Sequence, residues 1–251
     1  MARNPGKQPK YRAVADALRE RIAVGDFSEK GKLPTERDLR EEYGVSLATV
    51  RQALGVLRDE SLLESRVGSG WFLSQWRPIV RNANRRLLSA QWSEGRSMWD
   101  VDIDDRVLEA IDVEVERTAA PADVARALDI EPGDSVCRRS RRYVVDGKVV
   151  MRATSHIPSD LADGTRITQK DSGPGGTYAR LREAGHGPVK FREEVRCRLA
   201  SPEEIVDLKL AAGVPVVEQH RSAMRADGRV VEVNRMILDA SKFLLVYDFT
   251  A

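Results

Sequence analysis

A glycine-rich stretch, Asp171–Gly176, is the part of this 251-residue sequence that most directly suggests binding chemistry. It reads Asp-Ser-Gly-Pro-Gly-Gly and leads straight into a predicted helix, Thr177–Ala184. Exposed backbone amides at the start of a helix, with the positive end of the helix dipole, suit an anion, and glycines allow close approach to the backbone. The alternative is a surface loop that is merely rich in glycine.

A predicted strand rich in arginine offers cations for the same anion. Two arginine pairs, 138–139 and 141–142, flank Ser140. Side chains alternate between the two faces of a strand, so Arg139 and Arg141 share one face and the other three residues share the opposite one. We expect Arg139 and Arg141 to face the ligand.

Thr154 and His156 share a face on the next predicted strand and are further candidates for this ligand site. For His156 the alternative is a packed or surface position without a ligand.

A second kind of chemistry is indicated near the N-terminus. One short predicted helix begins after Thr35 and ends at Gly44, and another begins after Ser46. Two short helices joined by a glycine-containing turn are typical of a helix-turn-helix, whose second helix enters the major groove of DNA. The inward residues of that helix leave four residues free to face outward: Ala48, Thr49, Arg51 and Gln52.

The elements around this motif complete a winged helix. Apolar residues at helical spacing between Tyr11 and Ile22 predict a first helix. Leu62–Val67 and Trp71–Leu73 flank Gly68-Ser69-Gly70, which predicts a hairpin with a glycine tip.

Charge is distributed unevenly along the chain. Residues 1–90 hold 17 basic and 11 acidic residues, a net of +6, whereas the remainder holds 24 and 28, a net of −4. A basic N-terminal third joined to a mildly acidic remainder indicates a polyanion-binding module attached to a second domain. The 41% hydrophobic content is sufficient for a folded core.

Other classes of protein fit less well. No apolar run approaches the roughly 18 residues of a membrane span, and the first ten residues are polar. Cys137 and Cys197 are expected to be reduced thiols of a cytoplasmic protein, with a disulfide as the alternative. The histidines are scattered and no catalytic triad or carboxylate pair is recognisable, so we expect no metal, no cofactor and no enzyme activity.

The C-terminal two-thirds predict an α+β domain with an antiparallel sheet. Two hairpins turn at Asp146-Gly147 and Asp227-Gly228, and helices fill several intervals. The predicted strands are 113–117, 135–145, 149–156, 189–199, 215–225, 229–238 and 243–249, the last of which is expected to close the sheet. The predicted helices are 121–128, 177–184 and 201–210.

The N-terminal residues resemble the GntR-type winged-helix domain over about residues 11–73. The motifs that carry the resemblance are Leu33-Pro34-Thr35-Glu36-Arg37, Gly44-Val45-Ser46, Thr49-Val50-Arg51, Ala53-Leu54, Leu57, Glu60, Leu62 and Gly68-Ser69-Gly70-x-Phe72. One position departs from the pattern, because Leu47 stands where the family usually has an arginine that contacts DNA.

This resemblance implies that DNA contacts come from the second and third helices and the wing. An arginine can pair bidentately with guanine, and a glycine tip lets the wing backbone approach DNA. The residues expected in the DNA interface are Arg37, Ser46, Leu47, Ala48, Thr49, Arg51, Gln52, Arg66 and Gly68. For the arginines the alternative is a solvated surface charge.

Residues 92–250 resemble the UTRA domain of the HutC subfamily, which has a chorismate-lyase-like fold. The motifs are Glu131-Pro132-Gly133, Arg138–Arg142, Ala153-Thr154-Ser155-x-Ile157-Pro158, Tyr178-x-x-Leu181-x-x-x-Gly185-His186, Ala212-Gly213-x-Pro215-Val216, Val231-Glu232-Val233 and Tyr247-x-Phe249. The resemblance implies a small, anionic effector such as a sugar phosphate, held by loop amides, strand arginines and a glutamate that matches Glu232. For Glu232 the alternative is an exposed strand carboxylate.

Eleven residues are expected in the effector site: Arg139, Arg141, Thr154, His156, Ser172, Gly173, Gly175, Gly176, Thr177, Tyr178 and Glu232.

The expected layout is a flexible basic arm (1–10), a winged helix-turn-helix (11–75), a linker (76–91) and a UTRA effector-binding and dimerisation domain (92–251). Within the linker, Arg85 and Arg86 are expected either to touch the DNA backbone or to be solvated.

The resulting hypothesis is a cytoplasmic, homodimeric repressor on a near-palindromic DNA operator, with affinity controlled by the effector. Two alternatives remain: a constitutive repressor whose UTRA domain only dimerises, and an enzyme of chorismate-lyase-like fold.

Overall fold

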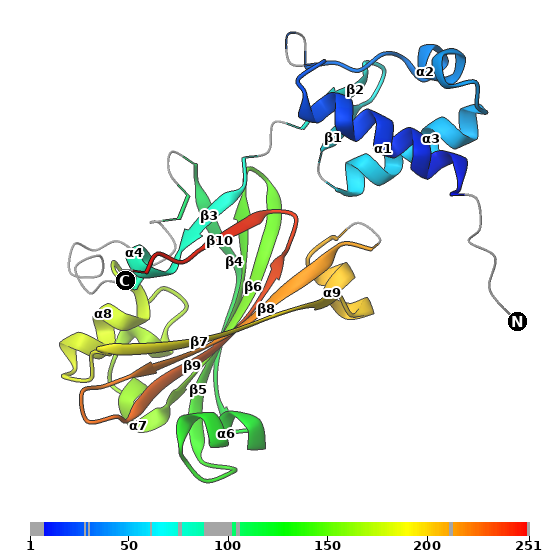
Figure 1. The fold of residues 1–251 in the computed structure, drawn as a ribbon. Coiled ribbons are helices and arrows are strands. Elements are labelled where there is room, and N and C mark those ends of the chain that lie inside the picture. Colours follow the sequence, from blue (N-terminus) through cyan, green and yellow to red (C-terminus); the bar gives the residue numbers. More distant parts are fainter. Residues whose placement is uncertain are drawn as a thin grey trace, which may run out of the picture. The chain divides into compact units, whose positions relative to one another are not determined.

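The computed structural model describes residues 8–27, 29, 31–60, 62–74, 77–87, 102–103, 106–210 and 213–249. The chain divides into two compact units (Figure 1). One consists of Met1–Arg77 with Ala211–Val214, and the other of Pro78–Leu210 with Pro215–Ala251. No helix in the described ranges has both the length and the apolar character that a membrane crossing requires.

The first unit is a winged helix-turn-helix. Its elements are α1 (Lys10–Ala23), α2 (Glu36–Tyr43), α3 (Leu47–Asp59), β1 (Leu63–Arg66) and β2 (Gly70–Leu73). The two strands pair antiparallel. The core contains the predicted inward residues Val14, Leu18, Leu39, Val50, Leu54 and Leu57, each at most 3% exposed. The predicted fold of this region is confirmed.

Local capping interactions set the boundaries of α2 and α3. Thr35 and Asp38 form a reciprocal capping box at the start of α2, in which each side chain accepts from the other residue's amide. Gly44 ends α2 in the left-handed conformation (φ +59°), and the Ser46 side chain caps α3 by accepting from the Thr49 amide. These short-range signals position the recognition helix.

The second unit is built on a six-stranded antiparallel sheet with the strand order β4-β5-β6-β9-β8-β7. Its strands are β4 (Leu108–Ala119), β5 (Ser135–Val145), β6 (Lys148–Pro158), β7 (Lys190–Leu199), β8 (Pro215–Met224) and β9 (Val230–Asp239). Asp146 (φ +50°) and Gly147 (φ +72°) form the predicted tight turn between β5 and β6. The α+β class with an antiparallel sheet is confirmed.

Helices cover both faces of this sheet. α7 (Ser159–Ala162), the 3-10 helix η1 (Arg166–Thr168) and α8 (Gly176–Glu183) pack on one face against Cys137, Ile157 and Ala223. α6 (Ala122–Leu128) packs near Val136 and Val233. α9 (Pro202–Asp207) follows β7 and ends earlier than the predicted 210.

The chain end does not close the main sheet as predicted. β10 (Phe243–Val246) instead pairs in parallel with β3 (Ile79–Asn82), and a helical turn, α4 (Ala83–Arg86), follows β3. Ile79 and Arg81 are buried by this arrangement. Residues 78–87 lie within the predicted linker, yet they form ordered elements of the second unit, because a partner strand more than 150 residues away provides their pairing.

Parts of the expected layout lie outside the described residues: most of the N-terminal arm, residue 75 at the end of the winged helix-turn-helix, the rest of the linker (76 and 88–91) and the predicted start of the UTRA domain at 92–101.

Candidate functional site

The first turns of α3 present a largely exposed surface. Leu47 is 36% exposed and the side chain of Arg51 is 64% exposed, while Ala48 and Gln52 are exposed as well. Val50 and Ala53, on the other side of the helix, are fully buried. Core packing therefore fixes the helix with its polar side outward, as a recognition helix requires.

A single carboxylate joins Arg51 to the neighbouring elements. Glu36 on α2 accepts from Arg51 Nε at 2.7 Å, and its other oxygen accepts from the Trp71 indole of β2 at 3.2 Å. Partial burial alone would raise the pKa of Glu36, but Arg51 and Trp71 lower it below its ordinary value, so the group stays ionised. Sequence reasoning did not assign this role to Glu36.

The other predicted DNA contacts are divided between exposed and capping residues. Arg37 is 81% exposed and makes a long ion pair with Glu41 at 3.3 Å. Ser46 and Thr49 lie 2.8 Å apart, hydroxyl to hydroxyl, at the start of α3. Ser46 is exposed and Thr49 is half-buried. Both hydroxyls already take part in the cap of α3.

The wing ends in a glycine that no side chain obstructs. Gly68 has a φ of +72°, and an added Cβ would meet no atom within 4 Å. Arg66, on the strand before it, pairs with Glu64 at 2.6 Å and lies 4.3 Å from the centroid of the Phe72 ring. The backbone of the tip is thus open to a close partner.

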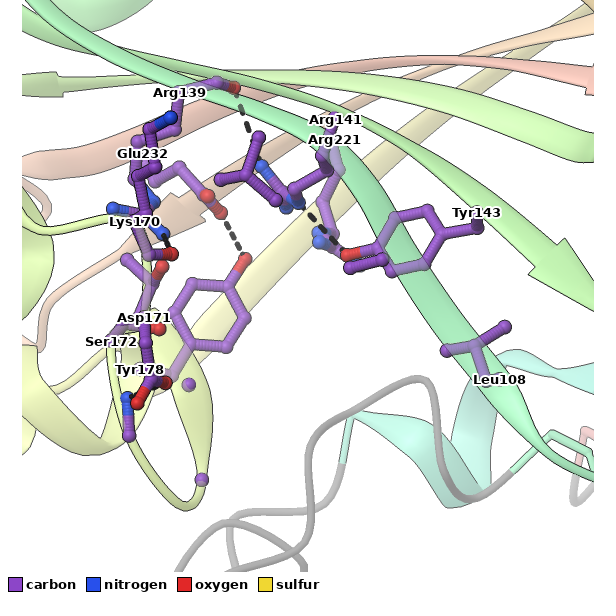
Figure 2. A pocket seen from close by; sticks show the side chains of 16 residues that line it. Leu108, Arg139, Arg141, Tyr143, Lys170, Asp171, Ser172, Tyr178, Arg221 and Glu232 are labelled. Atoms are coloured by element: carbon purple, nitrogen blue, oxygen red, sulfur yellow. Dashed lines mark hydrogen bonds between the residues drawn. The ribbon is translucent and has the colours of Figure 1, made fainter.

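In the second unit, a cavity of about 260 Å³ lies between β5, the loop before α8, and the strands β8 and β9 (Figure 2). Nine of the eleven predicted effector residues line it: Arg139, Arg141, Ser172, Gly173, Gly175, Gly176, Thr177, Tyr178 and Glu232. Residues that are far apart in sequence therefore surround one cavity, with arginines and a glycine loop facing it.

The glycine loop adopts a conformation that favours glycine. Gly173, Gly175 and Gly176 have φ values of +80°, +77° and +66°. Gly175 is the N-cap of α8 and has no side chain, so this helix starts without a side-chain cap hydrogen bond. The Asp171 carboxylate accepts from the Gly173 amide at 2.8 Å and stabilises the turn.

The two arginines of β5, Arg139 and Arg141, contact different groups. Arg139 is 4% exposed and donates to the carbonyl oxygens of Ile167, Gln169 and Lys170, so it holds the chain that leads into the glycine loop. Burial, followed by the neighbouring Arg141, lowers the pKa of Arg139.

Arg141 lines the cavity, where two neighbouring side chains hold its guanidinium. It donates from Nε to the Tyr143 hydroxyl at 2.8 Å and from Nη1 to Ser155 Oγ at 3.1 Å. Burial opposes the charge of Arg141, but Tyr143 and Glu232 raise its pKa above the ordinary value. The guanidinium remains a fixed positive charge at the cavity.

Tyr178 of α8 forms a buried polar group with Glu232 and Arg221, which lie on the same face of the sheet as Arg139 and Arg141. The Tyr178 hydroxyl donates to Glu232, which is only 2% exposed. The alternative interpretation of Glu232 as an exposed strand carboxylate is therefore wrong. Burial, and then Glu232, raise the pKa of Tyr178 well above its ordinary value despite the nearby Arg221. Burial would lower the pKa of Arg221, but Tyr178 and Glu232 raise it.

Two predicted effector residues lie on the opposite face of the sheet. Thr154 pairs with Ser140, and His156 pairs with Arg138. Residues directly opposite in an antiparallel ladder share a face, so Thr154 and His156 point away from Arg139 and the cavity. They line a different cavity of about 580 Å³, and burial lowers the pKa of His156.

Several residues at this site were not predicted. Tyr143, Lys170 and Arg221 also line the cavity. Arg221 could have been found from the alternation along β8, which places it on the same face as Val217 and Ala223, both buried. Tyr143 could have been predicted because alternation along β5 places it on the same face as Arg139 and Arg141. No pattern in the sequence indicates Lys170.

The expectation for the linker arginines was wrong for Arg86. Its side chain is 1% exposed and pairs with Glu193 of β7 at 2.5 Å. It is therefore neither solvated nor available to DNA, because the pairing of β3 and β10 places it inside the second unit. Nothing is described of the Arg85 side chain.

Comparison with known families accounts for both units. Residues 10–73 match the family model of bacterial regulatory proteins of the gntR family, and residues 105–243 match that of the UTRA domain. This chain belongs to the GntR family of transcriptional regulators. With a UTRA domain after the DNA-binding domain, this GntR regulator has the HutC-type architecture.

Several relatives of this GntR regulator align with nearly its whole length. An uncharacterized HTH-type transcriptional regulator of Streptomyces coelicolor, SCO4628, is 33% identical, and the match covers 97% of this chain and 93% of the relative. The mannosyl-D-glycerate transport/metabolism system repressor MngR of Escherichia coli is 30% identical, over 96% and 97%. PhnF from Mycobacterium smegmatis has a similar fold, with a TM-score of 0.58, 23% identity and coverage of 95% and 99%.

These matches assign each unit of the regulator a general role. Regulators of this family bind operator DNA through the winged helix and small-molecule effectors through the UTRA domain. The surface of α3 and the cavity beside α8 are the corresponding candidate sites.

Proposed function

We propose that this regulator is a cytoplasmic repressor whose affinity for its operator falls when a small anionic metabolite binds the cavity beside α8. One observation carries the proposal: Arg139, Arg141 and Arg221 line the same cavity as the glycine-rich start of α8, which has no side-chain cap. Guanidinium groups and free amides at the positive end of a helix are the groups that bind phosphate or carboxylate best.

The DNA contacts come from α2, α3 and the wing. Arg51 and Gln52 read base edges in the major groove, Arg37 and Thr49 contact the backbone or bases beside them, and the Gly68 backbone reaches the minor groove. Ser46, Ala48 and Arg66 complete this interface. Leu47 offers only an apolar contact where relatives place an arginine, so the operator differs from the common one at that position.

The repressor acts as a homodimer formed through the UTRA domain. Two copies of α3 then bind a near-palindromic operator whose half-sites lie about one helical turn apart. Effector binding favours a state with weaker DNA binding, and operator affinity falls by the ratio of the effector affinities in the two states. A sugar phosphate or another small anion is the class of effector that the cavity suits.

A titration against DNA from upstream of the protein's own gene tests the proposal. Fluorescence anisotropy, at one stated salt concentration, is measured with and without a panel of phosphorylated sugars and other anionic metabolites. Sequence-specific binding that one anion releases is the expected result. Binding no stronger than that to random DNA contradicts the proposal.

The same data separate the two alternatives. A constitutive repressor binds the operator specifically, but no anion in the panel changes either the binding or the melting temperature. Sequence-specific, anion-sensitive DNA binding argues for a regulator and against an enzyme of related fold.

A further inference from the structure

The main sheet has two edge strands, and they differ in how well they are protected. β4 and β7 lie at its two ends, and no other described strand pairs with either outer edge. β4 is interrupted by a bulge between Ile111 and Glu114, and four of its twelve residues are acidic. A bulge and a row of like charges both prevent an edge from pairing with a second copy of itself. β4 is therefore a protected edge.

β7 lacks both the bulge and the single sign of charge. Its register with β8 is continuous over all ten residues, and the strand contains no proline or glycine. It carries charges of both signs, four basic and two acidic. A long, regular edge presents a row of backbone donors and acceptors that another strand can pair with. The sheet can therefore be extended at β7.

The covered face of the sheet ends abruptly at this strand. Val195 and Leu199 of β7 are 42% and 75% exposed, and Cys197 between them is exposed as well. Their neighbours on β8 are buried: Gln219, opposite Val195, is 0% exposed, and Val217, opposite Cys197, is 7% exposed. Apolar side chains on the inner face thus remain uncovered only in the outermost strand, as expected where a further strand continues the sheet.

We propose that β7 pairs antiparallel with β7 of a second copy of this chain, about a twofold axis at Val195. The two six-stranded sheets then form one continuous sheet of twelve strands. The inference rests on the homodimer of the proposed function and specifies its interface. In this register Val195 lies opposite its own copy, and Phe191 lies opposite the partner's Leu199, so apolar side chains meet on the inner face.

Charges on the outer face select this register. With the axis at Val195, Glu194 lies opposite the partner's Arg196, and the symmetry makes this ion pair twice. An axis at Glu194 or at Arg196 would instead place that residue opposite its own copy, with like charges side by side. Arg192 does lie opposite the partner's Arg198, but each already pairs with a carboxylate of its own subunit, at 2.6 and 2.7 Å.

Disulfide cross-linking tests the register in the full-length protein. Val195→Cys is made in a Cys197→Ser background, and Leu199→Cys in the same background is the control. Opposite residues of an antiparallel pair have Cα atoms about 4.5–5.5 Å apart, within the range of a disulfide. In the proposed register the two copies of residue 199 lie about 27 Å apart along the strands, and the two wild-type Cys197 residues about 14 Å apart.

We expect mild oxidation with oxidised glutathione to cross-link most of the Val195→Cys protein, as seen on nonreducing gels. Less than about a tenth of the Leu199→Cys control or of the wild type should be cross-linked. Before oxidation, light scattering should give each protein twice the 28.0 kDa mass of one chain.

A charge on the axis provides a second measurement. Val195→Lys places two like charges opposite each other and should raise the dissociation constant of the dimer at least about tenfold in analytical ultracentrifugation. Val206→Lys is the matched control, because Val206 is 77% exposed and lies on α9, outside β7. That variant should leave the dissociation constant unchanged.

The outcomes separate this interface from the homodimer itself. A dimer in which Val195→Cys does not cross-link, or in which the Leu199→Cys control cross-links equally well, contradicts the β7 interface but not the homodimer. A dissociation constant that Val195→Lys leaves unchanged contradicts the interface in the same way. A protein that stays monomeric at micromolar concentration contradicts both the interface and the homodimer of the proposed function.

Discussion

Arg51 of the recognition helix donates to Glu36 of α2 at 2.7 Å, and the two side chains are 64% and 27% exposed. The same carboxylate accepts from Trp71 of the wing, so one acidic residue connects the three elements that a winged helix uses to contact DNA. This contact holds the Arg51 guanidinium beside Glu36 in the free protein.

Replacing Arg51 by alanine should strongly weaken specific operator binding and leave the fold intact. A bidentate arginine–guanine contact accounts for about 1–3 kcal/mol of discrimination, roughly a tenfold to hundredfold loss of affinity. The matched control is Arg58→Ala in the last turn of the same helix, where the guanidinium pairs with Asp59. Anisotropy titrations should show the loss only for Arg51→Ala; unchanged operator affinity in that variant would refute the assignment of the recognition helix.

Replacing Glu36 by glutamine tests whether orientation of Arg51 matters. The variant removes a negative charge beside the DNA surface, so binding to random DNA should strengthen slightly. Operator binding should weaken, because the Arg51 fork is no longer fixed, and the ratio of specific to nonspecific affinity should fall by about threefold to tenfold. Parallel titrations on operator and random DNA measure this ratio; a constant ratio would mean that Glu36 does not position Arg51.

Replacing Gly176 by glutamate should preserve DNA binding and blunt effector release. The substitution puts a carboxylate at the start of α8, where the ligand anion is expected, and imposes a φ of +66° on a residue with a side chain. At least about tenfold more effector should be needed to release the operator.

Gly176→Asn is the control for backbone strain, because asparagine tolerates the left-handed conformation and adds no charge. If Gly176→Glu responds to the effector as the wild type does, the loop is not part of the binding site.

Arg86→Ala should destabilise the protein strongly. Its ion pair with Glu193 is almost completely buried, and the variant leaves that carboxylate without its closest partner, at a cost of about 3–5 kcal/mol. Arg117→Ala is the comparison, because Arg117 and Asp163 are 60% and 46% exposed and such pairs contribute at most about 1 kcal/mol. Urea unfolding measures both; similar losses would contradict the burial of Arg86.

Acid should weaken the second unit through Glu204 and Glu218. Hydrogen bonds from Arg198 lower the pKa of Glu204 to about 2. Burial opposes the charge of Glu218, but Arg198, His220 and Arg235 also lower its pKa to about 2. Because an unfolded glutamate titrates near about 4.3, this stabilisation is complete above about pH 5 and is lost as the pH falls toward 2.

Glu204→Gln tests this dependence. It should lower the free energy of unfolding by on the order of 2 kcal/mol at pH 7, with a difference that shrinks as the pH falls below about 4. Melting temperatures of both proteins at pH 7, 5, 4 and 3 measure it, and a difference that does not change with pH would argue against a lowered pKa.

Short-range features of this protein could be derived from the residues alone. The capping box of Thr35 and Asp38, the left-handed Gly44 and the Asp146-Gly147 turn each depend on contacts within a few residues. Alternation along β5 was enough to place Arg139 and Arg141 on one face of the strand. The order of the motifs was enough to identify both domains. These features are local, so their physical causes are visible in a sequence window.

Other features depended on how distant segments pack. Arg86 is basic and lies in a polar stretch, and only its contact with Glu193, 107 residues away, makes it an interior residue. Thr154 and His156 alternate as a strand should, but a register shift between Tyr143 and Val144 in the β5–β6 hairpin places them opposite Ser140 and Arg138 instead of on the face of Arg139. Strand pairing over long separations depends on the free energy of the whole sheet, and no local pattern encodes it.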